Sequence, residues 1–270
     1  MIPNHPLRTL AASKLFMLGC IILSVNALTT GVYTFFAMRA SIPEMLNEIL
    51  NTSLFFSPDT LAQAKETIKY IAPISLASSV VFSFVLSSIP AFSLWLTYFS
   101  ARSASANLKT IGFSILNIYL LISVFSIGYN LILNIFGSIS GGFFSVVASS
   151  LEDLMNLAML ISARKLLFAA KEIAKTGNTR FTIDNRCAIL ILINLCVAAG
   201  TLILQIAANV YPHPSGQMLQ YVFSDLPSMI TGLAVSIVSI GEYTVFFFLC
   251  RKGISALSCN ILPPEETSII

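Results

Sequence analysis

The chain has 270 residues, of which 56% are hydrophobic and only 10% are charged, and its mean hydropathy is +0.85. A soluble domain carries about a quarter charged residues, so this composition excludes an ordinary water-soluble protein and indicates an integral membrane protein in a lipid bilayer. The net charge of +3 is too small to indicate nucleic acid as a partner.

Long apolar runs separated by charged or Pro/Gly-containing breaks predict six membrane spans. The runs are continuous and reach the roughly 20 residues that a helix needs to cross the hydrocarbon, so they predict α-helices and not barrel strands. We therefore expect an all-α integral membrane protein, a single polytopic domain over 1–270. The expected spans are Leu15–Met38, Ala72–Ser100, Thr110–Phe136, Phe143–Ala163, Cys187–Tyr211 and Leu226–Cys250.

The basic residues predict how these spans are oriented. Twelve of the fifteen fall at the termini or between spans two and three or four and five, and three fall on the opposite side, at Arg39, Lys65 and Lys69. By the positive-inside rule both termini are then cytoplasmic, in a plasma or bacterial inner membrane. The twelve are Arg8, Lys14, Arg102, Lys109, Arg164, Lys165, Lys171, Lys175, Arg180, Arg186, Arg251 and Lys252.

Between the first two spans, residues 39–71 form the only sizeable outer loop. Apolar residues recur there at helical spacing, which predicts two short amphipathic helices on the outer membrane surface or over the mouth of the bundle. Whether this loop only connects the spans or also binds a partner stays open.

Small residues recur at every fourth position in the second and sixth spans. Small side chains let membrane helices approach closely, so these stripes are expected to pack inside the bundle, with self-association as the alternative. Pro90 is expected to kink the second span. The stripes are Ser79, Ser83, Ser87 and Ala91 in the second span, and Ser228, Gly232 and Ser236 in the sixth.

Two adjacent acids, Glu152 and Asp153, interrupt the fourth span. Glu152 lies twelve residues before Arg164, about 18 Å along a helix and near the middle of the bilayer. Two ionised carboxylates there would repel one another and would each cost about 2.5–3.5 kcal/mol, so at least one is expected to be neutral. Counting helical rise from the nearest basic residue in the same way places polar groups of four other spans in this middle layer, which contains no Lys, Arg or His. These groups are Asn26, Asn117, Asn194 and Glu242.

Three interpretations of this layer stay open. The first is a proton, cation or substrate path on which Glu152, Asp153 and Glu242 are the protonatable groups. The second is that neutral acids and amides hold helices together through hydrogen bonds. The third is that residues 138–150 form an outer re-entrant segment, which would place the acid pair near water.

The inner loop, 164–186, begins with an amphipathic extension of the fourth span, which is expected to rest on the anionic inner leaflet and to end at Gly177. The segment that follows, "GNTRFTIDNRCAILILINL", resembles the juxtamembrane segment of an uncharacterised family of small bacterial multi-pass membrane proteins. The matching positions are Gly177, Phe181, Thr182, Asn185 and Arg186. The resemblance implies a bacterial inner membrane, although members of that family usually have four spans.

The leading hypothesis for function is a transporter-like or permease-subunit protein for a small solute, with a partner membrane subunit, an ATPase or a helix-mediated oligomer as its partner. The competing hypothesis is a non-transporting membrane factor with an assembly, sensory or immunity role. No HExxH, Walker A or GxSxG motif occurs, and the five cysteines include no CxxC pair, so the sequence indicates neither a catalytic residue nor a metal or cofactor and leaves enzymatic activity uncertain.

Overall fold

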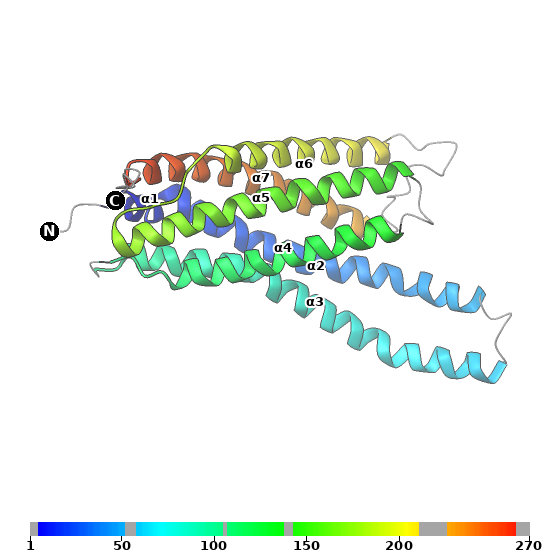
Figure 1. Cartoon of the computed structure of the whole chain (residues 1–270). Coiled ribbons are helices and arrows are strands. Elements are labelled where there is room, and N and C mark those ends of the chain that lie inside the picture. The colour runs from blue at the N-terminus through cyan, green and yellow to red at the C-terminus, as the bar shows by residue number, and fades with distance from the viewer. Residues whose placement is uncertain (1–4, 52–57, 105–106, 138–142, 211–225, 263–270) are drawn as a thin grey trace, which may run out of the picture. The chain divides into compact units, whose positions relative to one another are not determined.

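The structure is a computed structural model. It describes residues 5–51, 58–104, 107–137, 143–210 and 226–262. These residues form seven helices and no strand, which confirms the all-α fold (Figure 1). The helices are α1 Pro6–Ala11, α2 Lys14–Asn51, α3 Pro58–Arg102, α4 Ile111–Gly137, α5 Phe143–Thr176, α6 Arg186–Val210 and α7 Leu226–Ser258.

Five of these helices are long and apolar enough to cross a membrane over the described residues, which fits a multi-pass membrane protein. The five segments are Lys14–Ala40, Tyr70–Arg102, Ile111–Leu133, Arg186–Ala207 and Met229–Ser258. Each contains most of one span expected from the sequence. The expected fourth span, Phe143–Ala163, is helical and forms the first part of α5, but it is not one of the five.

The backbone contacts divide the chain into two compact units. Unit 1 comprises Met1–Ile22, Ile89–Val197 and Gly241–Ile270, and unit 2 comprises Leu23–Ser88 and Ala198–Ile240. Unit 1 contains α1, α4 and α5 whole, and α4 and α5 run antiparallel and side by side within it (Figure 1).

The helices around the expected outer loop are longer than the sequence predicts. α2 continues without a break to Asn51, past the expected end at Met38 and through Pro43, and α3 already begins at Pro58. The expectation of two separate short helices over 39–71 is therefore wrong for the described residues: the helical pattern there belongs to extensions of the neighbouring spans. One proline costs a helix a hydrogen bond, and it does not end this one.

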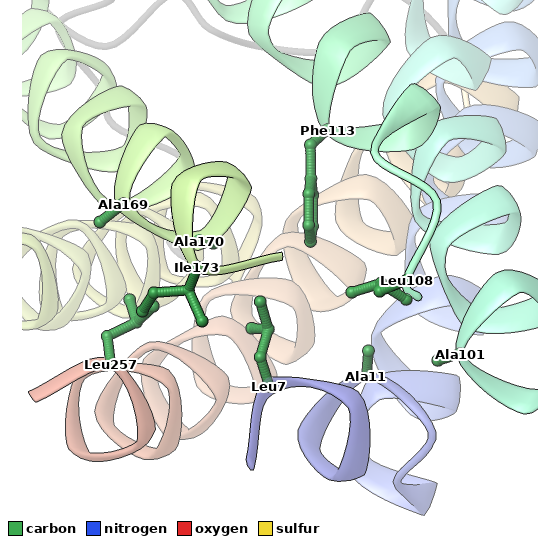
Figure 2. Close-up of a cluster of buried hydrophobic side chains, with 9 residues drawn as sticks. All are labelled: Leu7, Ala11, Ala101, Leu108, Phe113, Ala169, Ala170, Ile173 and Leu257. Carbon is green, nitrogen blue, oxygen red and sulfur yellow. The ribbon is translucent and has the colours of Figure 1, made fainter. Parts of the chain in front are cut away.

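The buried apolar core of unit 1 gathers around α1 and the last turns of α5 (Figure 2). Ala169, Ala170 and Ile173 of α5 are buried there with Leu257 of α7 and Leu7 of α1. The apolar face of the extended α5 is thus covered by protein, and the expectation that it rests on the inner leaflet is wrong. Ala11, Ala101, Leu108 and Phe113 complete this cluster.

The segment that follows α5 pairs with the residues that follow α7. Gly177 ends the helix with φ of +80°, a conformation that glycine adopts without strain, as its place in the sequence predicts. The Thr179 N–H donates to the Asn260 carbonyl at 2.9 Å, and the Leu262 N–H donates to the Thr179 carbonyl at 2.9 Å. Thr179 is fully buried, so this short parallel pairing ties the loop to the residues after α7.

The N-terminal helix α1 secures the end of α3. The Arg8 guanidinium donates from Nε to the Ala101 carbonyl at 2.9 Å and also donates to the Ser103 carbonyl. The last carbonyls of a helix have no partner within the helix and carry its negative dipole end, so a cation is a favourable cap there.

Small residues bring helices together in both units. In unit 2, the Ser83 hydroxyl lies 3.1 Å from the Thr34 hydroxyl of α2, and the Ser236 hydroxyl of α7 donates to Gln205 Oε1 of α6 at 3.0 Å. Gly232 and Ala91 are buried, Ser79 and Ser87 are half-buried, and the side chain of Ser228 lies outside the described part. Ser83 and Ser236 thus each contact a neighbouring helix, and the two stripes as a whole stay a prediction.

The tightest helix approach lies at a glycine that the stripes do not include. A Cβ added to Gly112 of α4 would lie 2.3 Å from Thr97 Oγ1 and 2.5 Å from the Ser93 carbonyl oxygen of α3. Ser93 and Thr97 are both fully buried, at 0% and 1% exposure. Ser93 and Thr97 thus form a second small-residue face of α3, about 200–240° around the helix from Ala91, and this face receives the start of α4.

Candidate intramembrane polar site

The acids of α5 and α7 converge on one tyrosine. Glu152 and Glu242 both lie close enough to the Tyr243 hydroxyl to act on it electrostatically, and Glu242 also acts on the Tyr119 hydroxyl of α4. All four residues belong to unit 1. Three helices thus supply two carboxyls and two phenols, each acid within electrostatic range of at least one tyrosine. We call these four residues the acid–tyrosine cluster.

The members of the acid–tyrosine cluster differ in how far the protein covers them. Glu152 is exposed, whereas Glu242, Tyr119 and Tyr243 are half-buried. Asp153, one position along α5, is half-buried and points in another direction, because successive helix positions are about 100° apart. The cluster therefore has an open end at Glu152 and a more enclosed end at Glu242.

These groups have the chemistry of a proton or cation site. A carboxyl holds or releases a proton, a carboxylate oxygen is a hard ligand for cations, and a tyrosine hydroxyl both donates and accepts hydrogen bonds. Nothing here resembles a nucleophile–base pair, and the described residues include no group of three His, Cys, Asp or Glu arranged to hold a metal ion.

The prediction that no basic side chain reaches the middle layer of polar residues is wrong at Asn117. The Arg164 side chain reaches from α5 to α4, and its Nε donates to Asn117 Oδ1 at 3.1 Å, while its guanidinium lies 5.6 Å from the centre of the Phe168 ring. Arg164 extends its long side chain along the helices, which a count of helical rise from Cα positions ignores. Asn117 thus belongs to an α4–α5 contact and not to a free polar path.

Asn194 is also used for helix contact. It is buried, at 4% exposure, and its Nδ2 donates to the Leu190 carbonyl at 3.0 Å and to Met159 Sδ of α5 at 3.3 Å. A buried amide satisfied in this way links α6 to α5, as the interhelical hydrogen-bond interpretation expects.

Asn26 belongs to unit 2, and the other residues of the expected layer belong to unit 1. Its side-chain Oδ1 accepts a hydrogen bond from the Thr30 hydroxyl at 3.4 Å, and its backbone carbonyl accepts one from Thr29 at 3.1 Å. These contacts occur within α2. The acid–tyrosine cluster is therefore defined without Asn26.

The third interpretation placed residues 138–150 in an outer re-entrant segment. Residues 138–142 lie outside the described part, but residues 143–150 are helical and continuous with the remainder of α5. Glu152 and Asp153 thus lie inside a 34-residue helix, on its tenth and eleventh residues.

Sequence reasoning missed Tyr119 and Tyr243. Both stand one or two positions from a residue already singled out, Tyr243 beside Glu242 and Tyr119 two after Asn117. An aromatic residue in a membrane span usually signals lipid contact or packing, so no pattern in the sequence marks these two hydroxyls as neighbours of acids.

No family model, curated protein or solved structure matches this chain.

Proposed function

We propose that this protein is a six-span cell-membrane protein of transporter-like or permease-subunit type, which moves a small solute. The observation that supports the proposal is that Glu152 of α5 lies within electrostatic range of Tyr243 of α7, the residue next to Glu242. Ionisable groups inside membrane bundles are costly and are typically placed on proton, ion or substrate paths. In this proposal the two carboxyls carry the proton or cation, and Tyr243 connects them.

The charge distribution supports an orientation with both termini in the cytoplasm. All twelve basic residues assigned to the inner side belong to unit 1, and Arg39, Lys65 and Lys69 belong to unit 2. The sixth span of this proposal is the first part of α5, whose acids lower its hydropathy. A segment carrying acids inserts best when neighbouring helices shield them. The packing of α5 against α4 leaves Asp153 half-buried, whereas Glu152 is exposed.

A second function, a non-transporting membrane factor, is favoured by a different observation. Asn117 and Asn194 are both engaged in bonds between helices, to Arg164 and to Met159 respectively. If the acids play the same part, the polar residues only hold the bundle together and the protein acts as an assembly, sensory or immunity factor.

Proton uptake into proteoliposomes distinguishes the two functions. The purified full-length chain is reconstituted with a pH-sensitive dye inside, and an outward potassium gradient with valinomycin sets an inside-negative potential. The transport proposal predicts uptake that E152Q and E242Q each abolish while the variants remain folded. Glu172 lies on the extension of α5 beyond the expected span, so E172Q is the matched control and should retain uptake.

Two results would exclude the proposal. One is the absence of uptake of protons, sodium or potassium by the wild-type chain. The other is uptake that E152Q and E242Q leave unchanged. Loss of thermal stability in both variants, with no ion movement in the wild type, would instead support the helix-holding function.

A further inference from the structure

Two of the five cysteines, distant in sequence, lie together in the structure. Cys187 is the second residue of α6, and Cys250 lies in the last turns of α7. Their thiols lie within interaction range of one another, and the pairing of Thr179 with Asn260 and Leu262 holds the segment before α6 beside the segment after α7. Both residues belong to unit 1, and both thiols are free.

The surroundings of the pair suit thiol chemistry. Cys187 is buried and Cys250 is half-buried, so a small disulfide reaches the sulfur of Cys250 before that of Cys187. The thiolate is the reactive form of cysteine, and the more accessible Cys250 is the thiol that meets a small disulfide first. Asp184 acts electrostatically on Cys187 and forms an ion pair with Arg186 at 3.2 Å, so the local charge is mixed.

The other three cysteines differ in exposure. Cys20 is buried in α2, and Cys196 and Cys259 are exposed. A single exposed thiol forms only a mixed disulfide with a small molecule, whereas two neighbouring thiols can displace it and close a ring. The neighbouring positions of Cys187 and Cys250 thus allow a reaction that a single exposed thiol does not have.

We propose that Cys187 and Cys250 are an oxidisable dithiol that a low-molecular-weight disulfide, such as glutathione disulfide, converts into a bond between α6 and α7. The Cys250 thiolate attacks one sulfur of the small disulfide, forms a mixed disulfide and releases one small thiol. The Cys187 thiolate then attacks the Cys250 sulfur and releases the second small thiol. Two electrons pass from the protein to the small disulfide, and the two protein thiol protons are transferred to the released thiolates.

This modification is independent of the transport proposal, because it requires only the two thiols and their contact. It would fix the start of α6 to the end of α7 in unit 1. Both cysteines adjoin basic residues assigned to the cytoplasmic side, where glutathione keeps thiols reduced under ordinary conditions. The disulfide is therefore expected to form when that pool becomes oxidised.

Chemical cleavage at methionine tests the proposal on the full-length chain in membrane vesicles. Cyanogen bromide cuts after Met218 and Met229, which separates the part of the chain containing Cys187 from the part containing Cys250. After treatment with glutathione disulfide, the two fragments should stay joined on a non-reducing gel and separate when dithiothreitol is added. Without oxidant they should run apart.

Variants assign the link to the proposed pair. A C20S/C196S/C259S chain retains only Cys187 and Cys250 and should give the same joined fragments. Adding C187S to it should leave a glutathione adduct on Cys250 and no link. If the cysteine-poor chain does not fold, tandem mass spectrometry of the joined fragments from the wild-type chain identifies the linked residues.

Either of two results would overturn the proposal. The first is separate fragments from the oxidised wild-type chain. The second is a link through Cys196 or Cys259, which would disappear in the C20S/C196S/C259S chain while that chain remains folded.

Discussion

Substitution of Gly112 by alanine tests the tight approach of α3 and α4. The new Cβ would lie 2.3 Å from Thr97 Oγ1 and 2.5 Å from the Ser93 carbonyl oxygen. The hydroxyl could rotate away, but it would lose its 3.0 Å hydrogen bond to that carbonyl, and the carbonyl belongs to a buried helix backbone that cannot rotate. Overpacking of this kind costs about 1–3 kcal/mol. Because Gly112 is the second residue of α4, alanine's helix preference offsets little of this.

Gly128 provides the matched control on the same helix, since a Cβ there has no atom within 4 Å. G128A should be neutral or more stable by about 0.5–1 kcal/mol. The assay is the free energy of unfolding in mixed detergent–SDS micelles, followed by circular dichroism. T97A should rescue G112A only in part, because the Ser93 carbonyl remains. Equal stability of G112A and G128A would refute the packing of α4 against α3 described here.

Three further predictions use the same unfolding assay. R8A should lower the free energy of unfolding by about 1.5–3 kcal/mol, because a charged cap on the end of α3 disappears. The control K252A removes an exposed side chain and should change it by less than about 0.5 kcal/mol. Similar losses in the two variants would contradict the cap. N194L should cost about 0.6 kcal/mol through its lost contact to α5, and a gain in stability would contradict that role. Partial burial lowers the pKa of His5 below its usual 6.5, and its Nε2 has no partner among the described residues. As the pH falls through 6.5, the unfolded chain therefore binds a proton at His5 before the folded chain does, which favours unfolding. The free energy of unfolding of the wild type should thus fall from pH 8 to pH 5 relative to that of H5Q, and parallel pH profiles would refute this.

The helices could be predicted because membrane spans have a strong local signal. Continuous apolar runs located α4, α6 and the start of α7 closely, and Gly177 marked the end of α5 through a conformation that glycine adopts most easily. The predicted ends of the first two spans were less accurate. Hydropathy reports where the hydrocarbon ends, whereas a helix such as α2 continues as long as its backbone bonds persist.

The partners of each helix face could not be predicted. The apolar stripe with Ala170 and Ile173 reads the same whether lipid or protein covers it, and the structure shows protein. The distance of Arg164 from Asn117 along the sequence gives no sign that its side chain reaches across to α4. Likewise, the meeting of Glu242 with Tyr119 depends on how α7 and α4 are placed, which one sequence does not encode in any local pattern.

The central claim is that Glu152 and Glu242 carry protons inside the membrane, and carbodiimide labelling tests it most directly. A hydrophobic carbodiimide reaches protonated carboxyls in the bilayer, and a water-soluble one reaches only carboxyls in contact with water. At neutral pH the hydrophobic reagent should modify Glu152 and Glu242 in proteoliposomes, and the water-soluble one should modify Glu172 alone of these three acids. Modification of Glu152 or Glu242 by the water-soluble reagent, or failure of the hydrophobic reagent to modify either, would contradict the account.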